Sequence, residues 1–214
     1  MKITPACLPD LIQAIAQAIE NQADEVTLLD QALGDGDHVF NLQRGLSALL
    51  HQSQELTSLA WPAAWQKIGM ILMSTIGGAA GSLYGTLFIA MSKTARDQIV
   101  DRAGFAVIFA QGVEAVKQRG KASAGEKTLL DVLIPVADYL VANSAATELS
   151  ELLQNVSRVA FDGMESTRDM IATKGRASFL GERSKGQIDA GAKTAQLMIT
   201  AIVDALTGAS ASPS

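Results

Sequence analysis

Apolar residues recur every three or four positions along most of this 214-residue chain. One apolar face is formed by Ile12, Ile15 and Ile19, and others occur within residues 105–116 and 195–206. This spacing places the apolar side chains on one side of an α-helix. Strand signals are weak, because alternating β-branched runs are missing and aromatic residues make up only 5% of the chain. The sequence therefore predicts an all-α bundle of about eight helices.

Glycine-bearing or polar connections separate the expected helices. They lie near residues 34–37, 52–58, 77–81, 120–125, 143–148 and 175–191. Thr128 followed three residues later by Asp131 predicts a capping box at the start of one helix, and Pro135 predicts a kink or an early end of that helix.

The composition fits one large domain. Since 48% of the residues are hydrophobic, the chain can bury a substantial core. We expect a single domain over residues 1–207 and a flexible tail over residues 208–214, which are small and polar. The net charge of −5 gives no basic footprint, so we expect no nucleic-acid partner.

The cysteine content and the first residues bear on the cellular compartment. The single cysteine, Cys7, excludes an internal disulfide and suits a reducing environment. No uninterrupted apolar run precedes Pro9 and Asp10, which disfavours a secretory signal. We therefore expect a cytoplasmic protein.

Residues 68–92 carry no charge and are long enough to span a bilayer. They contain five glycines, three of them in the stretch GGAAG at 77–81, which favours a break between two buried helices over one membrane span. We expect no membrane association. Large side chains at helical spacing around the start of this segment are expected in the core: Trp61, Trp65, Met70 and Met73.

Three carboxylates, Asp30, Asp35 and Asp37, lie within eight positions. Held about 4 Å apart, such groups repel each other by a few kcal/mol per pair, unless a cation lies between them. Oxygen ligands without a histidine or cysteine cluster favour magnesium, calcium or manganese over zinc. Gly34 and Gly36 allow the sharp turn that would bring the three together. The alternative is that these aspartates only cap helices.

The spacing of the three aspartates further narrows the choice of metal ion. The EF-hand pattern is absent, which disfavours calcium sensing. Magnesium usually takes few protein ligands and shares its coordination shell with phosphates, so a phosphate-bearing ligand follows. GGAAGSLYGT, with a glycine pair before a helix, fits an anion at a helix N-terminus, although close helix packing is an equal alternative. Neither the P-loop nor the Rossmann fingerprint is present.

The connection from Lys174 to Ala190 is about 17 residues long, which is unusual between helices. Its mixture of charged and apolar residues predicts an ordered, functional lid. Arg176 and Arg183 could bind phosphate there, or one or both could pair with Glu182 or Asp189 on the surface. His38 could donate a proton or contact a phosphate, or could be purely structural.

Four segments in this order resemble a known family: LDQALGDGDHVFNLQRG, GGAAGSLYGT, RGKASAGEKTLLDVLIPV and KGRASFLGERSKGQIDAGA. They are similar to the L subunit, the nucleotide-binding DhaL type, of dihydroxyacetone kinase. The resemblance extends from about residue 10 to residue 207 and implies an antiparallel eight-helix barrel whose loops at one end bind Mg-ADP or Mg-ATP.

The resemblance also implies site residues. Asp30, Asp35 and Asp37 match the family's magnesium ligands, for two ions that bridge the phosphates, and together with Arg176 they would serve catalysis. The positions that match its nucleotide contacts are His38, Val39, Phe40, Asn41, Ala79, Ala80, Gly120, Leu129, Arg176, Asp189, Ala190 and Gly191.

The partners follow from the same resemblance. The L subunit passes a phosphoryl group to dihydroxyacetone, which a separate K subunit holds covalently, and this chain contains no counterpart of the K domain. In the phosphoenolpyruvate-dependent form, ADP stays bound and is rephosphorylated by an M subunit that carries phosphohistidine. In the ATP-dependent form, nucleotide exchanges freely. A chain without a fused K domain favours the first arrangement.

Five positions depart from the family's usual pattern: Val39, Ala80, Ser82, Gln187 and Ala190. They leave the magnesium ligands unchanged and bear on the acceptor sugar, the partner and the retention of ADP. Ala80, for example, lacks a hydroxyl that would contribute about 1 kcal/mol to phosphate binding. Three alternatives stay open: a subunit for another small ketose, a nucleotide-sensing protein that a transcriptional regulator recognises, and a metal-independent helical interaction module.

Overall fold

The computed structural model describes residues 4–145 and 147–208. Within these ranges the chain is helical and contains no strand, which confirms the all-α prediction. The α-helices are α1 (Leu8–Asn21), α2 (Ala23–Leu33), α3 (His38–Leu56), α4 (Trp61–Thr75), α5 (Gly78–Thr94), α6 (Arg102–Gly120), α7 (Leu130–Asn143), α8 (Leu149–Ser166) and α9 (Ala190–Thr207). Three 3₁₀ segments complete the list: η1 (Pro5–Cys7), η2 (Thr167–Asp169) and η3 (Arg176–Ser184).

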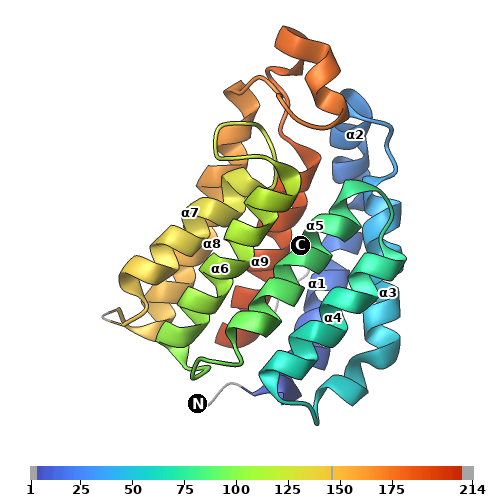
Figure 1. The fold of residues 1–214 in the computed structure, drawn as a ribbon. Coiled ribbons are helices and arrows are strands. Elements are labelled where there is room, and N and C mark those ends of the chain that lie inside the picture. Colours follow the sequence, from blue (N-terminus) through green and yellow to red (C-terminus); the bar gives the residue numbers. More distant parts are fainter. Residues whose placement is uncertain (1–3, 146, 209–214) are drawn as a thin grey trace.

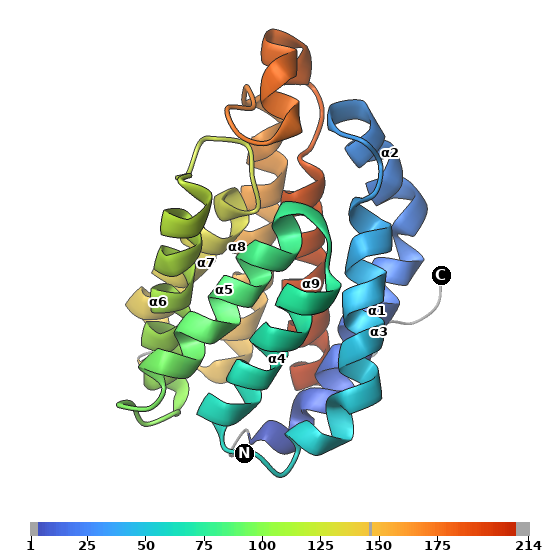
Figure 2. The ribbon, with the colours of Figure 1, turned by 45° about the vertical axis from the view of Figure 1, so that its right-hand side comes forward.

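Eight of these helices form a closed ring. Following the chain, α1, α3, α4, α5, α6, α7, α8 and α9 each pack against the next, and α9 packs against α1 to close the barrel (Figures 1 and 2). Successive helices run in opposite directions, as the resemblance implied. The ninth helix, α2, follows α1 after a break at Gln22 and extends beyond the ring at one end (Figure 1).

The up-and-down topology places alternate connections at the same end of the barrel. The connections at 34–37, 76–77, 121–129 and 167–189 all lie at one end, called the site end below. The longest of them contains η3, drawn in orange beside α2 in Figure 1, and residues 170–189 are called the lid. The glycine-rich and charged segments of the sequence therefore come together because of the fold.

The barrel interior is filled by aliphatic side chains from all eight ring helices. On α4, the buried side chains are Ala64, Trp65, Ile68, Ile71 and Leu72, which form one face at helical spacing. Met70 and Met73 lie on the other face and are 59% and 49% exposed, so their predicted place in the core is wrong. Because α4 is apolar on both faces, its pattern does not distinguish the inner face from the outer one.

The uncharged segment 68–92 contains a helix break, as predicted. It is divided between α4 and α5, and the break at Ile76 and Gly77 comes slightly earlier than expected, with Gly78 already in α5. In the described ranges, no helix combines the length and the apolar character that crossing a bilayer requires. The expected tail at 208–214 lies outside the described residues except for Gly208, which ends α9.

The start of α7 shows the predicted capping box in part. Asp131 Oδ2 accepts from the Thr128 N–H at 2.7 Å, whereas Thr128 Oγ1 accepts from the Leu130 N–H at 3.1 Å and not from Asp131. Pro135 lies inside α7, which continues to Asn143, so the helix does not end early.

Candidate functional site

The three predicted carboxylates meet at the site end. One carboxylate oxygen from each of Asp30, Asp35 and Asp37 lies within 4.8 Å of the other two. Asp30 comes from the last turn of α2, and the other two come from the connection to α3. This spacing of hard oxygen donors suits a divalent cation such as magnesium.

The local backbone explains how the three carboxylates converge. A Cβ at Gly34 would lie 2.8 Å from Asp30 Oδ1, so only glycine leaves room for that carboxylate. Gly36 has φ of 77°, which glycine adopts without strain. The backbone N–H of His38 donates to Asp30 Oδ2 at 3.1 Å and joins the start of α3 to the end of α2.

Helix capping alone does not explain this cluster. Asp37 occupies the N-cap position of α3, but its side chain makes no capping hydrogen bond. Asp30 accepts from the first N–H of α3, yet it lies on the preceding helix. Two of the three carboxylates are exposed and one is half-buried, so they are open to a ligand from the site end.

Arg176, the first residue of η3, brings the lid to the carboxylates. Its Nη1 forms an ion pair with Asp35 Oδ2, and the guanidinium side chain remains 67% exposed. Arg176 therefore pairs with a predicted metal ligand and not with Glu182 or Asp189, which were the alternative partners. Arg183, at the far end of η3, is exposed.

His38 is half-buried, and its imidazole points toward α9. Its Nε2 lies 2.9 Å from Thr194 Oγ1, and Thr194 is fully buried on α9. Burial lowers the pKa of His38, and the charges of Asp30 and Asp37 act in the opposite direction. The imidazole joins α3 to α9 directly beneath the carboxylates. Of the neighbouring predicted contacts, Val39 is buried in the core, so only its backbone can face a ligand.

The start of α5 lies in the same region. Asn41, which is buried on α3, accepts at its Oδ1 from Arg44 Nη2 at 3.0 Å. A Cβ at Gly77 would lie 2.6 Å from this Asn41 oxygen, so the two segments approach closely. Ala79 is exposed and Ala80 is half-buried in the first turn of α5, where free N–H groups and the helix dipole favour an anion.

A further group of predicted contacts lies where α7 and α9 begin. Leu129 is buried, and a Cβ at Gly191 would lie 3.8 Å from the Leu129 Cβ, so these positions are adjacent. Asp189 caps α9 by accepting from the Ala192 N–H at 2.8 Å. Burial raises the pKa of Asp189 to about 6, although its hydrogen bond from Ala192 and the charge of Lys127 act in the opposite direction. Ala190 is buried behind this cap.

Two other predicted nucleotide contacts, Gly120 and Phe40, are at least partly exposed to solvent. Gly120 ends α6 and is half-buried. Phe40 is 65% exposed in the first turn of α3, and the Arg44 guanidinium lies 5.8 Å from the centre of its ring.

Sequence reasoning missed one polar residue of this region. Lys127, in the connection to α7, is only 1% exposed, and its Nζ donates to the carbonyl oxygens of Thr167 and Gln187, each at 2.5 Å. Its neighbour Asp131 accepts from the N–H groups of Gly125 and Thr128. A lysine in a polar connection gives no sequence signal of burial, since lysine is normally exposed.

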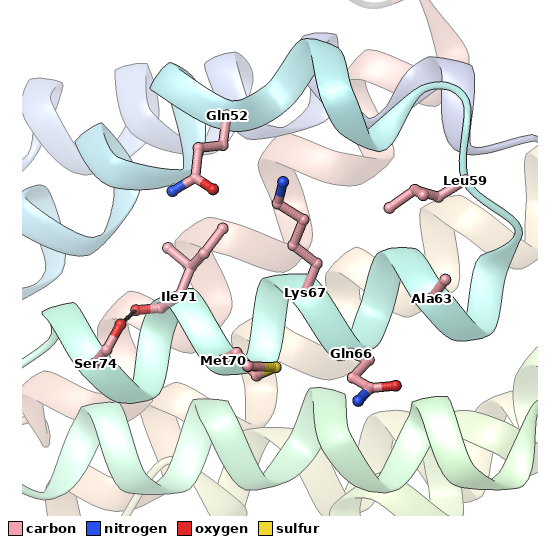
Figure 3. A pocket seen from close by; sticks show the side chains of 8 residues that line it. All are labelled: Gln52, Leu59, Ala63, Gln66, Lys67, Met70, Ile71 and Ser74. Atoms are coloured by element: carbon pink, nitrogen blue, oxygen red, sulfur yellow. Dashed lines mark hydrogen bonds between the residues drawn. The ribbon is translucent and has the colours of Figure 1, made fainter.

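A groove of about 570 Å³ lies on the outer surface of the barrel between α3 and α4, away from these residues (Figure 3). Its lining consists of Gln52, Leu59, Ala63, Gln66, Lys67, Met70, Ile71 and Ser74. None of the predicted site residues lines it.

Comparison with known proteins gives one matching family model, the DAK2 domain, over residues 32–204. A phosphoenolpyruvate-dependent dihydroxyacetone kinase ADP-binding subunit, DhaL, from Listeria innocua is 41% identical over 175 residues, which are 82% of this chain and 83% of that protein. The corresponding subunit from Escherichia coli K12 is 36% identical over 83% of this chain and 86% of its own length.

Larger proteins match this chain over part of their length. The human triokinase/FMN cyclase is 29% identical over 92% of this chain and 34% of that protein. The crystal structure of the dihydroxyacetone kinase from C. freundii in complex with AMP-PNP and Mg²⁺ superposes with a TM-score of 0.73 at 20% identity, and the match covers 93% of this chain and 34% of that one. This likeness shows that the fold is shared.

Proposed function

This chain belongs to the DAK2-domain family, among the DhaL-type subunits of dihydroxyacetone kinases, and on that premise we propose that it passes a phosphoryl group from bound nucleotide to dihydroxyacetone held on a separate K subunit. The nucleotide-binding unit is the domain over residues 1–207. The observation that supports the proposal most strongly is the convergence of three carboxylates within 4.8 Å at the end of the barrel where α3, α5, α7 and α9 begin.

The carboxylates are the proposed magnesium ligands. Asp30, Asp35 and Asp37 supply only oxygen ligands, and the cluster contains no thiolate. Such a set of ligands suits magnesium. These three residues would hold the two magnesium ions that we propose, next to the phosphates of the nucleotide. Bound magnesium offsets the negative charge that develops on the transferred phosphoryl group.

The starts of α5 and α9 are the proposed nucleotide contacts. Around Ala79 and Ala80, the first N–H groups of α5 are free to bind phosphate oxygens. At α9, Asp189 holds the first turn in place, and Gly191 and Leu129 form an adjacent apolar surface. His38, held by Thr194, fixes the first turn of α3 so that its backbone and that of Val39, Phe40 and Asn41 face the ligand.

Arg176 is the proposed catalytic cation from the protein. It reaches Asp35 from the lid and is largely exposed, so it is free to turn toward a phosphate next to the carboxylates. A guanidinium binds phosphate oxygens in a bidentate manner and keeps its charge throughout the reaction. The chain itself needs no general base, because the acceptor is held on the partner and catalysis rests on position and charge.

The phosphoryl donor and the compartment are part of the proposal. The subunits from Listeria innocua and Escherichia coli are named as phosphoenolpyruvate-dependent, which supports a bound ADP that is rephosphorylated in place by a phosphohistidine-carrying M subunit. We place the protein in the cytoplasm. A transcriptional regulator that senses the loaded state would be a further partner of the same site.

The nucleotide content of the purified protein tests the proposal. The full chain is purified without added nucleotide, precipitated with acid, and its supernatant analysed before and after dialysis against a magnesium chelator. Stoichiometric ADP that is lost only with the chelator is expected. An empty protein whose melting temperature rises with Mg-ATP would indicate free exchange and direct use of ATP, with about 2.7 kcal/mol of stabilisation at a hundredfold excess over Kd. An empty protein that neither nucleotide stabilises would contradict the proposal.

A further inference from the structure

Lys127 is a buried lysine to which the proposed function assigns no role. It is the largest side chain in the described structure that is almost completely buried, with 1% exposure, and its backbone has φ of 60°. Both features are unfavourable for lysine, because burial removes water from the ammonium group and the left-handed conformation strains a residue with a Cβ. An arrangement that is unfavourable twice needs a compensating role in the site.

The contacts of Lys127 identify this role. Its Nζ donates to the Thr167 carbonyl at 2.5 Å and to the Gln187 carbonyl at 2.5 Å. Thr167 lies just before the lid leaves the barrel, and Gln187 lies just before the lid rejoins it at α9. One ammonium group therefore connects the two ends of a loop that are 20 residues apart in the sequence.

Few other contacts connect the two ends of the lid. The Gly186 N–H donates to the Arg168 carbonyl at 2.8 Å, and the Asp189 N–H donates to Thr167 Oγ1 at 3.1 Å. Higher up, the Ala172 N–H donates to Ser184 Oγ at 2.9 Å. Lys127 differs from these contacts because it joins both ends to a third segment, the connection that begins α7.

The neighbouring residue strengthens the same attachment. Glu126 Oε1 accepts from Thr173 Oγ1 at 3.0 Å and lies 3.3 Å from Lys174 Nζ. Glu126 and Lys127 thus hold the base of the lid on the barrel, and Arg176 follows directly after the residues that they hold. Beyond this base, η3 of the lid lies next to α2 (Figure 2). Arg176 pairs there with Asp35, which lies in the connection that follows α2.

We propose that Lys127 is a positioning residue for the phosphoryl-transfer site: by joining the two ends of the lid to the start of α7, it holds Arg176 over the carboxylate cluster and Asp189 at the start of α9. This inference rests on the proposed function. Lys127 does not touch the nucleotide; it acts through Arg176 and the return segment of the lid. An apolar side chain of similar length would fill the space but would remove the Lys127 donor from both carbonyl groups, so that of these two carbonyls only that of Thr167 would keep a donor among the described residues, the Met170 N–H at 3.2 Å.

The test compares full-length variants that have been freed of nucleotide by dialysis against a magnesium chelator and returned to magnesium buffer. They are compared by calorimetric titration with Mg-ADP and by thermal unfolding without nucleotide. Lys127→Met removes the donors with little change in length, and Lys127→Arg keeps the charge and the N–H groups. Lys117→Met is the matched control, because Lys117 is half-buried on α6 and pairs only with Glu114 three residues away. We expect Lys127→Met to weaken Mg-ADP binding about tenfold or more, Lys127→Arg to stay within about threefold of wild type, and Lys117→Met to match wild type.

A double-mutant cycle separates positioning from a purely structural role. If Lys127 acts through the lid, Lys127→Met added to Arg176→Ala should weaken binding by less than about threefold, since the group that it positions is already gone. Trypsin should also cut the Met variant faster at Lys174, Arg176, Arg183 and Lys185 in the lid. Fully additive losses, with unchanged cleavage in the lid, would overturn the inference.

The remaining outcomes are also decisive. Wild type that does not bind Mg-ADP would contradict the proposed function itself, whereas wild type and Lys127→Met that bind equally would overturn only the role of Lys127. If Lys127→Met does not fold, Lys127→Gln, which keeps one amide donor, takes its place in the same cycle. Lys127→Gln is then expected to weaken Mg-ADP binding less in the Arg176→Ala variant than in the wild-type protein. Equal losses of affinity in the two proteins would overturn the inference.

Discussion

The two ends of the barrel close the same eight helices in different ways. At the end opposite the site, the connections at 57–60, 95–101 and 144–148 are short and link neighbouring helices directly. At the site end, the connections at 34–37 and 76–77 are also short, but those at 121–129 and 167–189 are longer. These two longer connections contain the buried Lys127 and glycines with positive φ. Since both ends close the same barrel, the extra length of these two connections exceeds what joining neighbouring helices requires, which is consistent with the proposed binding site.

This comparison predicts that carboxylates at the two ends have opposite roles. At the opposite end, Asp101 caps α6 by accepting from the Gly104 N–H at 2.8 Å, so its carboxylate contributes to stability. At the site end, Asp35 and Asp37 are exposed and close to each other and to Asp30, so without a cation they repel. Charge at one end stabilises the fold, whereas charge at the other end is available for a ligand.

The largest effect is expected for the double variant Asp35→Asn with Asp37→Asn. Mg-ADP binding should weaken about a hundredfold or more, because two of the three charges that bind the cation are lost, each worth a few kcal/mol at short range. The melting temperature without nucleotide should stay the same or rise, since the relieved repulsion outweighs the loss of the exposed ion pair between Asp35 and Arg176, which contributes less than about 1 kcal/mol. Titration calorimetry and thermal unfolding measure both quantities. Asp97→Asn, an exposed change at the opposite end, is the control. A marked loss of stability without nucleotide would contradict this account.

The next effect concerns turnover. Arg176→Ala should lower the rate of phosphoryl transfer, measured with the K partner and dihydroxyacetone, by about a hundredfold or more, because a cation beside the transferred phosphate is lost. Arg176→Lys should recover only part of the rate, because an ammonium group does not reproduce the planar bidentate contact. Mg-ADP affinity should weaken by about tenfold, less than the rate, because in the proposed site Arg176 also contacts the phosphates of the bound nucleotide. If the rate of Arg176→Ala equalled that of wild type, Arg176 would have no catalytic role.

Much of this fold is predictable from the sequence for identifiable reasons. Helical spacing indicates helices, and glycines mark the breaks at Gly34 and Gly77. The break between α1 and α2 at Gln22 was not predicted, because neither glycine nor proline marks it and the turn depends on packing of α2 against α9. The outward position of Met70 and Met73 was also not predicted, since only the neighbouring helices determine which apolar face of α4 is buried.

The candidate site also has features that the sequence predicts and features that it does not. The carboxylate cluster was visible in the sequence because Asp30, Asp35 and Asp37 are close along the chain, and like charges at short range indicate a missing cation. The burial of Lys127 and the contact between His38 and Thr194 join segments 60 and 156 residues apart. Contacts of that kind depend on how the barrel closes, so no local pattern indicates them.

A smaller effect is expected from the pH dependence of stability at the site end. Burial raises the pKa of Asp189 to about 6, above its ordinary value of 3.8, so the folded state binds this proton more tightly than the unfolded state. This contribution to stability is fully present below pH 3.8 and is lost as the pH rises through about 6. Asp189→Asn keeps an oxygen that can accept from the Ala192 N–H and removes the titration.

The variant should therefore gain stability relative to wild type as the pH rises from about 4 to above 6, by roughly 1–3 kcal/mol, and then level off. Urea denaturation of both proteins at several pH values, in a magnesium chelator, measures the difference. A difference that stays constant over this range would show that Asp189 titrates normally. Asp138→Asn on α7 is a control at a position with no role in the site.

The smallest effect completes the comparison from the opposite end. Asp101→Ala should lower the free energy of unfolding by about 1 kcal/mol, because α6 loses its capping hydrogen bond. Its Mg-ADP affinity should equal that of wild type, since Asp101 lies at the other end of the barrel from the carboxylates. Asp101→Asn, which keeps a capping oxygen, should recover most of the stability. If Asp101→Ala instead weakened Mg-ADP binding, the ends would be coupled through α6, and stability and ligand binding could no longer be assigned to separate ends.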